Sequence, residues 1–125
     1  QVLLVEDNAI NMEIAHAILE EEHLNITEAK NGKEAVEIFQ NSKSNEYDVI
    51  IMDVMMPVMD GLEATKAIRM LEREDAKKIP IIAMTANAFE EDRKACLDAG
   101  MNEHIGKPID IPLLKRTITK AIGDR

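Results

Sequence analysis

The chain has 125 residues, with 15 Lys and Arg against 24 Asp and Glu, which gives a formal net charge of −9. This length fits one domain, and a hydrophobic content of 46% is too high for a disordered chain. The acidic balance argues against nucleic acid as a partner, because phosphate backbones are bound by Lys and Arg. No apolar stretch approaches the length of a membrane span, so no membrane contact is expected from this segment.

Three short apolar runs are typical of strands that are buried on both faces of a parallel sheet. They cover residues 2–5, 49–52 and 81–84. Two weaker segments, residues 25–29 and 104–105, predict further strands, and the first of them alternates like an edge strand.

Segments of helical periodicity separate these strands. The first places Ile10, Ile14 and Ile18 at four-residue intervals, with Ala15 and Leu19 widening the apolar stripe. Four later segments also predict helices. The apolar positions are Ala35, Val36 and Phe39 in the second helix, Leu62, Ala64, Ala67, Ile68 and Leu71 in the third, and Leu114, Ile118, Ala121 and Ile122 in the last. The fourth helix is expected over residues 88–99. Gly100 is expected to end the fourth helix and Asp110 to cap the last. The charged run 72–78 is expected to be a solvated surface.

Strand and helix alternate five times, which predicts an α/β fold with a parallel five-stranded sheet between two helical layers. The expected fold class is a flavodoxin-like three-layer sandwich; if the strand order is 2-1-3-4-5, as in that fold, the first and third strands are neighbours. Ligands of such sheets bind outside the carboxyl ends of the strands. Function is accordingly expected from the residues that end the strands.

Three carboxylates follow the two strands that are neighbours in this order. Glu6 and Asp7 follow the first strand, and Asp53 follows the third. Clustered carboxylates repel one another unless a cation lies among them. Oxygen ligands without His or Cys favour a hard cation, so the sequence predicts a site for Mg²⁺ or Mn²⁺.

Two further polar residues end the remaining central and edge strands. Thr85 ends the fourth strand and Lys107 the fifth; a hydroxyl and an ammonium group can both bind phosphoryl oxygens. A carboxylate can act as the nucleophile that accepts a phosphoryl group. Asp53 is the best candidate, because it ends the central and most apolar strand.

Five motifs around these strand ends resemble the receiver domain of two-component response regulators, over essentially the whole chain. They are Val5-Glu6-Asp7-Asn8, Met52-Asp53-Val54-Met55-Met56-Pro57-Val58-Met59-Asp60-Gly61, Met84-Thr85-Ala86-Asn87-Ala88, Asp98-Ala99-Gly100-Met101 and Gly106-Lys107-Pro108-Ile109. The motifs are most similar to the receivers of hybrid sensor histidine kinases. The resemblance implies one receiver domain over residues 1–125, which is expected to come from a longer protein.

The resemblance also implies that Asp53 takes a phosphoryl group from a phosphohistidine, in a reaction that needs Mg²⁺ or Mn²⁺. Asp7 would bind the metal directly and Glu6 through water. Asp53 and the backbone carbonyl of Met55 would complete the protein ligands. The phosphorylated domain would then present a changed interaction surface.

Thr85 and Lys107 would bind the phosphoryl oxygens of the modified protein. In the family the threonine moves inward on phosphorylation, and an aromatic residue of the fifth strand follows it. His104 occupies that aromatic place in this chain. An imidazole is smaller and more polar than the usual ring, so the chain departs from the family at its switch position.

The implied partner is a histidine kinase or a histidine phosphotransfer protein in the cytoplasm, whether or not the parent protein is anchored in a membrane. The first helix is the expected contact surface, together with the last strand's loop; the residues are Ile10, Asn11, Ile14, Ala15 and Pro108. The domain is expected to be a monomer, or a dimer that forms on phosphorylation. By itself it is no kinase, since it catalyses only its own phosphorylation and dephosphorylation.

Three alternatives stay open at this point. A degenerate receiver would serve only as a docking module. A phosphatase of the haloacid dehalogenase type also forms an aspartyl phosphate, but it has a second Asp at the place that Met55 holds here. A flavodoxin-like cofactor carrier needs a phosphate-binding loop after the first strand, where Glu6 and Asp7 would repel phosphate.

Overall fold

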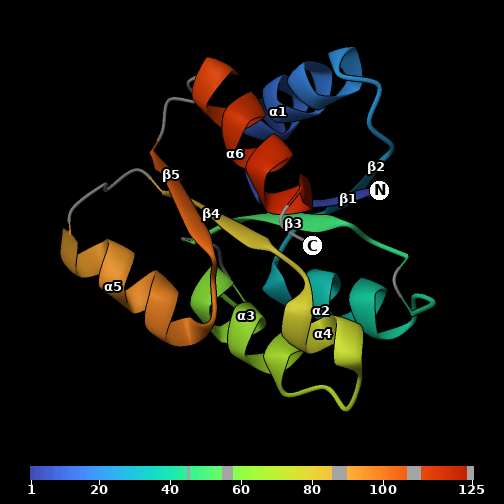
Figure 1. The fold of residues 1–125 in the computed structure, drawn as a ribbon, viewed down its shortest axis with the longest axis vertical. Helices are drawn as coiled ribbons and strands as arrows, with labels where there is room; N and C mark the ends of the chain where they lie inside the picture. Colours follow the sequence, from blue (N-terminus) through green and yellow to red (C-terminus); the bar gives the residue numbers. More distant parts are fainter. Residues whose placement is uncertain (45, 55–57, 86–89, 107–110, 124–125) are drawn as a thin grey trace.

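The structure, a computed structural model, describes residues 1–44, 46–54, 58–85, 90–106 and 111–123, with the side chains at 85, 90–93, 111, 122 and 123 excepted. Five parallel strands form one sheet in the order β2-β1-β3-β4-β5 (Figure 1). They are β1 (Val2–Val5), β2 (Ile26–Ala29), β3 (Val49–Asp53), β4 (Ile81–Thr85) and β5 (Glu103–Gly106). The predicted strand order is confirmed, and β2 is an edge strand as expected.

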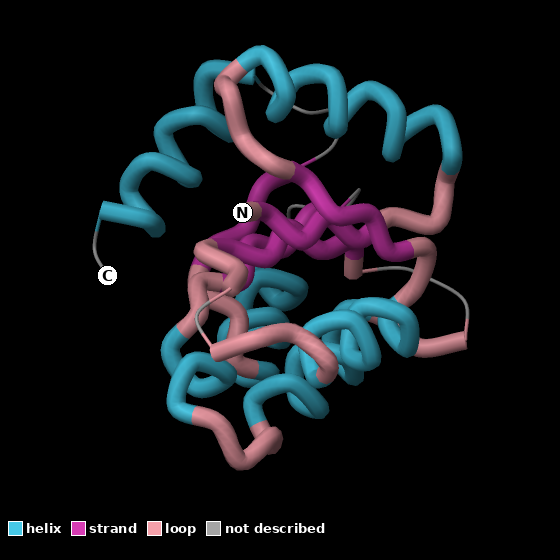
Figure 2. Tube along the Cα trace, turned by 90° about the vertical axis from the view of Figure 1, so that its right-hand side faces the viewer, coloured by secondary structure: helices cyan, strands magenta, loops and turns pink. Residues whose placement is uncertain are grey.

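Two helical layers cover the sheet (Figure 2). One face carries α1 (Ala9–Glu21) and α6 (Ile111–Gly123), and the other carries α2 (Gly32–Gln40), α3 (Gly61–Arg69), α4 (Glu74–Lys78) and α5 (Glu90–Ala99). Among the described residues, no helix is long and apolar enough to span a membrane. The three-layer α/β architecture predicted from the alternating pattern is confirmed.

The strands separate the core into two apolar clusters, because successive side chains point to opposite faces of a sheet. In β1, Val2 and Leu4 pack on the α1 and α6 side, and Leu3 and Val5 pack on the opposite side. All four are fully buried. This double burial explains why the central strands are continuous apolar runs.

The buried face of α1 differs from the predicted stripe. Met12, Ala15 and Leu19 are buried, whereas Ile10 is 69% and Ile14 50% exposed. Residues four apart turn about 40° around a helix at each step, so a series spaced only by four leaves the face that packs on the sheet. The spacing of three and then four from Met12 to Leu19 follows that face more closely.

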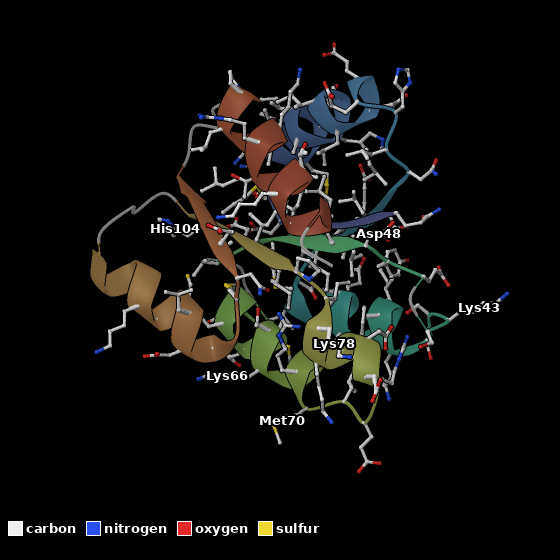
Figure 3. All side chains as sticks on the ribbon, in the orientation of Figure 1. Lys43, Asp48, Lys66, Met70, Lys78 and His104 are labelled. Carbon is white, nitrogen blue, oxygen red and sulfur yellow. The ribbon has the colours of Figure 1, made fainter. Side chains whose placement is uncertain are left out.

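The segment after α3 is in part the predicted solvated surface, since Glu72, Glu74, Lys77 and Lys78 are exposed, but the prediction is wrong for Asp75. It contains the helix α4, in which Asp75 is buried at 6% exposure. Arg73 pairs with Asp75 at 2.8 Å and donates to the carbonyl oxygens of Phe39 at 2.7 Å and Lys43 at 3.0 Å. These contacts join α4 to the end of α2, so the charges of Arg73 and Asp75 are partnered inside the fold. Met70, between α3 and this segment, is 83% exposed and points out of the molecule (Figure 3).

Arg69 joins three elements near the amino ends of the strands. Its guanidinium donates to the carbonyl oxygen of Gly100, to that of Ala76, and to the side-chain oxygen of Asn102, at 2.8–3.0 Å. Burial lowers the pKa of Arg69 below its usual value, which reflects the cost of removing the cation from water. The hydrogen bonds to oxygen acceptors offset that cost.

Helix ends follow the sequence signals where the structure describes them. Gly100 ends α5 with a φ of +112°, as expected for a glycine after a helix. α6 begins at Ile111, and the predicted cap Asp110 lies outside the described residues, as does Ala88 before α5.

His23 occupies the same kind of position at the end of α1, with a φ of +63°. Its N–H donates to the carbonyl oxygen of Glu20 at 3.0 Å, and that of Leu24 donates to Leu19 at 3.4 Å. This left-handed conformation destabilises a residue with a β-carbon by about 1 kcal/mol relative to glycine. We therefore expect His23→Gly to raise the free energy of unfolding by about 1 kcal/mol, measured by urea denaturation. His23→Ala keeps the β-carbon and is the control; equal stability of the two variants would contradict the prediction.

Candidate functional site

The pairing of β1 with β3 brings together the three carboxylates at the carboxyl ends of the strands. Val5 lies opposite Met52 in the parallel register, so Glu6 and Asp53 follow as adjacent residues on neighbouring strands. A ligand oxygen of Glu6, of Asp7 and of Asp53 all lie within 4.8 Å of one another. In the part of the chain that the structure describes, this is the one such group of three potential metal ligands.

Two of these carboxylates are buried and the third faces solvent. Glu6 is 2% and Asp53 4% exposed, whereas Asp7 is exposed. Glu6 continues the side of β1 that carries Val2 and Leu4, so its side chain lies under the start of α1. The site is therefore partly closed by protein and open at Asp7.

The start of α1 holds Glu6 in place. The backbone N–H of Asn8 donates to Oε1 of Glu6 at 3.3 Å, and Nδ2 of Asn11 lies 3.5 Å from the same oxygen. The Asn8 side chain caps the helix by accepting from the N–H groups of Ile10 and Asn11 at 2.9 and 3.0 Å. The positive end of the α1 dipole also favours anions at this place.

The donor set fits a hard divalent cation. At separations below 4.8 Å, each pair of carboxylate charges repels by roughly 3 kcal/mol or more at an effective dielectric constant of about 20. A cation among them removes this repulsion, and carboxylate oxygens are the ligands that Mg²⁺ and Mn²⁺ prefer. The residues present thus fit the metal that the sequence predicts.

A groove of about 520 Å³ leads to the carboxylates along α1. Glu6, Asp7 and Glu13 line it near the site, and His16 lies farther along it. The His16 ring is 2.7 Å from Glu28 and 3.2 Å from Glu20. Most charged groups of the groove are acidic, so it attracts cations toward the site.

The residues predicted to bind phosphoryl oxygens are described only in part. Thr85 ends β4, and its backbone lies opposite Gly106 of β5; its side chain lies outside the described residues, as do Met55, Lys107 and Pro108. The strand pairing still places the ends of β3, β4 and β5 next to one another.

His104 lies on β5 opposite Ala83 of β4 (Figure 3). Its Nε2 is buried and has no hydrogen-bond partner in the described part of the chain. The neighbouring Ile105 packs on the α1 and α6 side, so His104 belongs to the opposite face of the sheet. The position predicted as the switch is thus half-buried, on the side of α5.

The predicted partner contacts of α1 divide into exposed and buried residues. Ile10 is 69% and Ile14 50% exposed, close to the helix end that holds Glu6. Asn11 lies between them and is half-buried. Ala15 is 2% exposed and belongs to the core cluster, so the surface open to a partner is the Ile10 and Ile14 pair.

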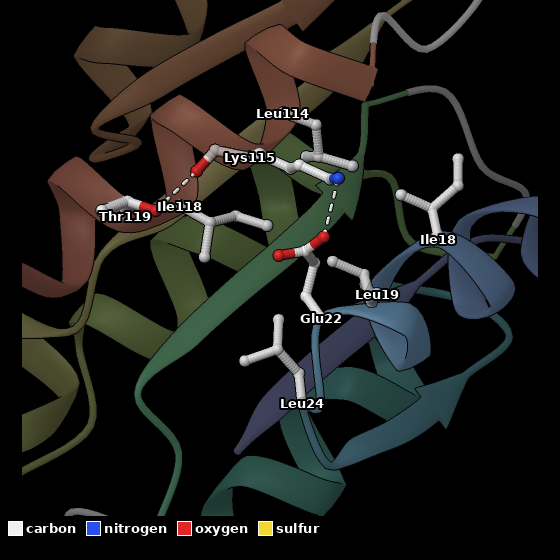
Figure 4. Close-up of a pocket in the computed structure, with 8 residues that line it drawn as sticks. All are labelled: Ile18, Leu19, Glu22, Leu24, Leu114, Lys115, Ile118 and Thr119. Carbon is white, nitrogen blue, oxygen red and sulfur yellow. Dashed lines mark hydrogen bonds and ion pairs between the residues drawn. The ribbon is translucent and has the colours of Figure 1, made fainter.

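A second cavity, of about 410 Å³, lies between α1 and α6 (Figure 4). Its apolar lining is Ile18, Leu19, Leu24, Leu114 and Ile118, and Lys115 pairs with Glu22 across it at 2.7 Å. The hydrogen bond and charge of Glu22 raise the pKa of Lys115 above its usual value. Leu24 precedes Asn25, which bonds to the first residue of β1. This cavity is therefore at the amino end of the sheet, away from the three carboxylates.

Comparison with known proteins agrees with the geometry. Residues 2–119 match the family of the response regulator receiver domain. Hybrid signal transduction histidine kinase I of Dictyostelium discoideum is 40% identical over 124 residues, which are 98% of this chain and 7% of that protein. The osmosensing histidine protein kinase SLN1 of Saccharomyces cerevisiae is 42% identical over 123 residues, which are 96% of this chain and 10% of that protein.

Solved structures show the same fold. The receiver domain of a sensor histidine kinase from Pseudomonas aeruginosa, with a magnesium ion coordinated in its active-site cleft, matches with a TM-score of 0.87 and 40% identity over 98% of this chain and 96% of that one. The receiver domain of Ssk1, co-crystallised with the histidine phosphotransfer protein Ypd1 of Saccharomyces cerevisiae, matches with a TM-score of 0.86 and 34% identity, over 96% and 86% of the two chains.

We expect Mg²⁺ to raise the melting temperature of this chain through the three carboxylates. A metal that binds only the folded state at about ten times its dissociation constant stabilises it by about 1.4 kcal/mol. Asp7→Asn should abolish most of this increase, and it should make the metal-free protein more stable because it removes one repelling charge. Thermal unfolding with Mg²⁺ and with a chelator measures both effects.

Glu13→Gln is the matched control for this prediction. Glu13 lines the same groove but is not one of the three clustered carboxylates. Its variant should keep the full Mg²⁺ response. If Asp7→Asn responds to Mg²⁺ as strongly as the parent chain does, the metal is bound elsewhere.

Proposed function

Because the chain belongs to the response regulator receiver domain family, we propose that it accepts a phosphoryl group on Asp53 from a partner phosphohistidine. The observation that carries this proposal is the position of the Asp53 carboxylate, which is 4% exposed at the end of the central strand and adjacent to two other carboxylates. A carboxylate held in this way is positioned as a nucleophile beside a cation site.

In the transfer, a carboxylate oxygen of Asp53 attacks the phosphorus atom. The bond between phosphorus and the imidazole nitrogen of the partner breaks, and its electron pair stays on that nitrogen. The product is an acyl phosphate on Asp53. Bound Mg²⁺ or Mn²⁺ would supply neutralisation of the negative charge on the phosphoryl oxygens.

The ligands proposed for the metal are Asp7 and Asp53 directly, Glu6 through water, and the Met55 backbone carbonyl. The hydrogen bonds of Glu6 Oε1 to Asn8 and Asn11 hold its carboxylate beside Asp7 and Asp53. The magnesium ion in the cleft of the Pseudomonas receiver domain supports the same class of metal here.

Thr85 and Lys107 are proposed to bind the oxygens of the transferred group, since Thr85 ends β4, which pairs with β3, and Lys107 follows β5, the next strand of the sheet. A displacement of Thr85 on phosphorylation would reach His104, which pairs with the same strand two residues earlier, at Ala83. The buried Nε2 of His104 gives this switch position a hydrogen-bonding group in place of an aromatic carbon.

The proposed partner is a histidine kinase or a histidine phosphotransfer protein, which contacts α1 at Ile10 and Ile14. The complex of the yeast receiver domain with Ypd1 supports this kind of partner. We also propose a cytoplasmic location and a monomeric state, or a dimer formed on phosphorylation. The acidic net charge of −9 disfavours nucleic acid as a ligand of this domain.

The parent protein is proposed to be a hybrid histidine kinase. Receiver domains within such kinases are among the relatives of this chain, and the chain spans 5% to 15% of the curated relatives it matches. The activity of any further domains would then belong to the parent and not to this chain.

We expect the chain to gain the mass of one phosphoryl group when it is incubated with Mg²⁺ and acetyl phosphate. Asp53→Asn, which is nearly isosteric, should abolish this gain and leave the fold intact. Intact-mass spectrometry measures the gain, and hydroxylamine should remove it because an acyl phosphate is labile. Asp98→Asn changes an exposed carboxylate of α5 and should be modified like the parent; a modified Asp53→Asn would place the acceptor elsewhere. An unmodified parent chain that also fails to bind Mg²⁺ would favour the docking-only alternative.

Ile14→Asp should weaken transfer from a phosphorylated histidine phosphotransfer protein more than it affects the reaction with acetyl phosphate. Ile14 is 50% exposed, and a charge in an apolar contact typically costs a few kcal/mol of binding. Leu97→Asp is the matched control, because Leu97 is 48% exposed on α5. The KM for the phosphorylated partner should rise only in Ile14→Asp. An equal rise in both variants would exclude α1 as the specific contact.

A further inference from the structure

The segment Val58–Asp60, between β3 and α3, holds a strained residue. Val58 has a φ of +70° and is 78% exposed. A β-branched side chain crowds the backbone in this left-handed region, and the exposed side chain of Val58 gains little packing in return. Such a conformation persists only where neighbouring contacts determine it, so the contacts on each side of Val58 must hold its backbone.

On one side, the first residue of α2 holds this segment. The N–H of Gly32 donates to the carbonyl oxygen of Met59 at 3.0 Å. A β-carbon added to Gly32 would lie 2.4 Å from that oxygen and 3.0 Å from the carbonyl oxygen of Asp60. Both neighbours are backbone atoms, which cannot rotate away as a side chain can. Gly32 therefore permits a backbone approach that any other residue would prevent.

On the other side, the segment continues into α3, which contacts the end of β3, the strand that carries Asp53. The side chain of Asp60 caps α3 by accepting from the N–H of Glu63 at 2.8 Å, and the N–H of Gly61 donates to Val54 at 2.9 Å. A β-carbon on Gly61 would lie only 2.4 Å from the carbonyl oxygen of Asp53. The start of α3 thus lies directly against the backbone of Asp53, with no space between them.

We propose that Gly32 is a positioning residue for Asp53, an inference that rests on the proposed phosphoacceptor function. A side chain at position 32 must push the carbonyl of Met59 away by about half an ångström to reach even a close contact of 3.0 Å. That displacement passes through Asp60 to the start of α3, and from there to the backbone that carries the Asp53 carboxylate. Phosphoryl transfer depends on placement within such distances, because a shift of about 1 Å can reduce a rate about a hundredfold.

Gly32→Ala tests the proposal, with Gly100→Ala as a matched control. Gly100 has a φ of +112°, and an added β-carbon would lie 3.0 Å from the Arg69 side chain. The same substitution therefore strains the fold at both positions, but Gly100 lies at the end of α5, away from the carboxylates. The rate of Mg²⁺-dependent phosphorylation by acetyl phosphate should fall about tenfold to a hundredfold in Gly32→Ala. Gly100→Ala should react at the parent rate, at a temperature where both variants are folded.

Equal rates in Gly32→Ala and the parent chain would overturn the proposal, and so would equal losses in the two glycine variants. If Gly32→Ala does not fold, the amide resonances of the isotope-labelled parent chain decide. Addition of Mg²⁺ should shift the Gly32 amide and leave the Gly100 amide unchanged; an unchanged Gly32 amide would contradict the coupling.

Failure of the proposed phosphoacceptor function can be distinguished from failure of the positioning role of Gly32. A parent chain that gains no phosphoryl group argues against the acceptor chemistry, and the contrast between the two glycine variants is then measured on Mg²⁺ affinity. A weaker affinity in Gly32→Ala alone would still support the positioning role. A parent chain that neither binds Mg²⁺ nor accepts a phosphoryl group would overturn both proposals.

Discussion

The register between β1 and β3 is the constraint on which the site depends. Val5 pairs with Met52, so the next residue of each strand is a carboxylate, and both point to the side covered by α1. A shift of one residue would turn every side chain of the strand to the other face. It would exchange the side chains that pack in the two core clusters and separate Glu6 from Asp53. Because both clusters are closely packed, they oppose this exchange, so the same packing that forms the core also places the acidic site.

Features that destabilise the fold lie at the carboxyl end of the sheet, and polar contacts that stabilise it lie at the amino end. The carboxyl end holds clustered carboxylates and the left-handed Val58. At the amino end, Arg69 and Arg73 donate to the carbonyl oxygens of Ala76, Gly100 and Phe39. Active regions commonly carry strain that the rest of a fold offsets. The two arginines and the apolar core therefore stabilise a fold whose other end holds three mutually repelling carboxylates.

The sequence predicted those features of the fold that depend on residues near one another in the chain. The buried strands are continuous apolar runs, and the residues that follow them in the chain must lie at the sheet edge, so the carboxylate cluster followed from the strand order. The buried face of α1 could not be predicted in this way. Met12 is buried and Ile10 is exposed, and which of them is buried depends on how the helix lies on the sheet. The short helix α4 was missed because Asp75 is buried by a partner, Arg73, whose other contacts lie about thirty residues away in the chain. Charged residues that are paired in this way look the same in sequence as solvated ones.

The acidic site lies between two supports on opposite faces of the sheet. On one face, α1 holds Glu6 through Asn8 and Asn11 and presents Ile10 and Ile14 to solvent. On the other face, α2 and α3 hold the backbone that follows Asp53. Ile10 and Ile14 are exposed on the first support, whereas Gly32 and Gly61 of the second are buried. A partner that contacts α1, as proposed, would therefore meet the layer that holds Glu6, while the backbone after Asp53 is held from the opposite layer.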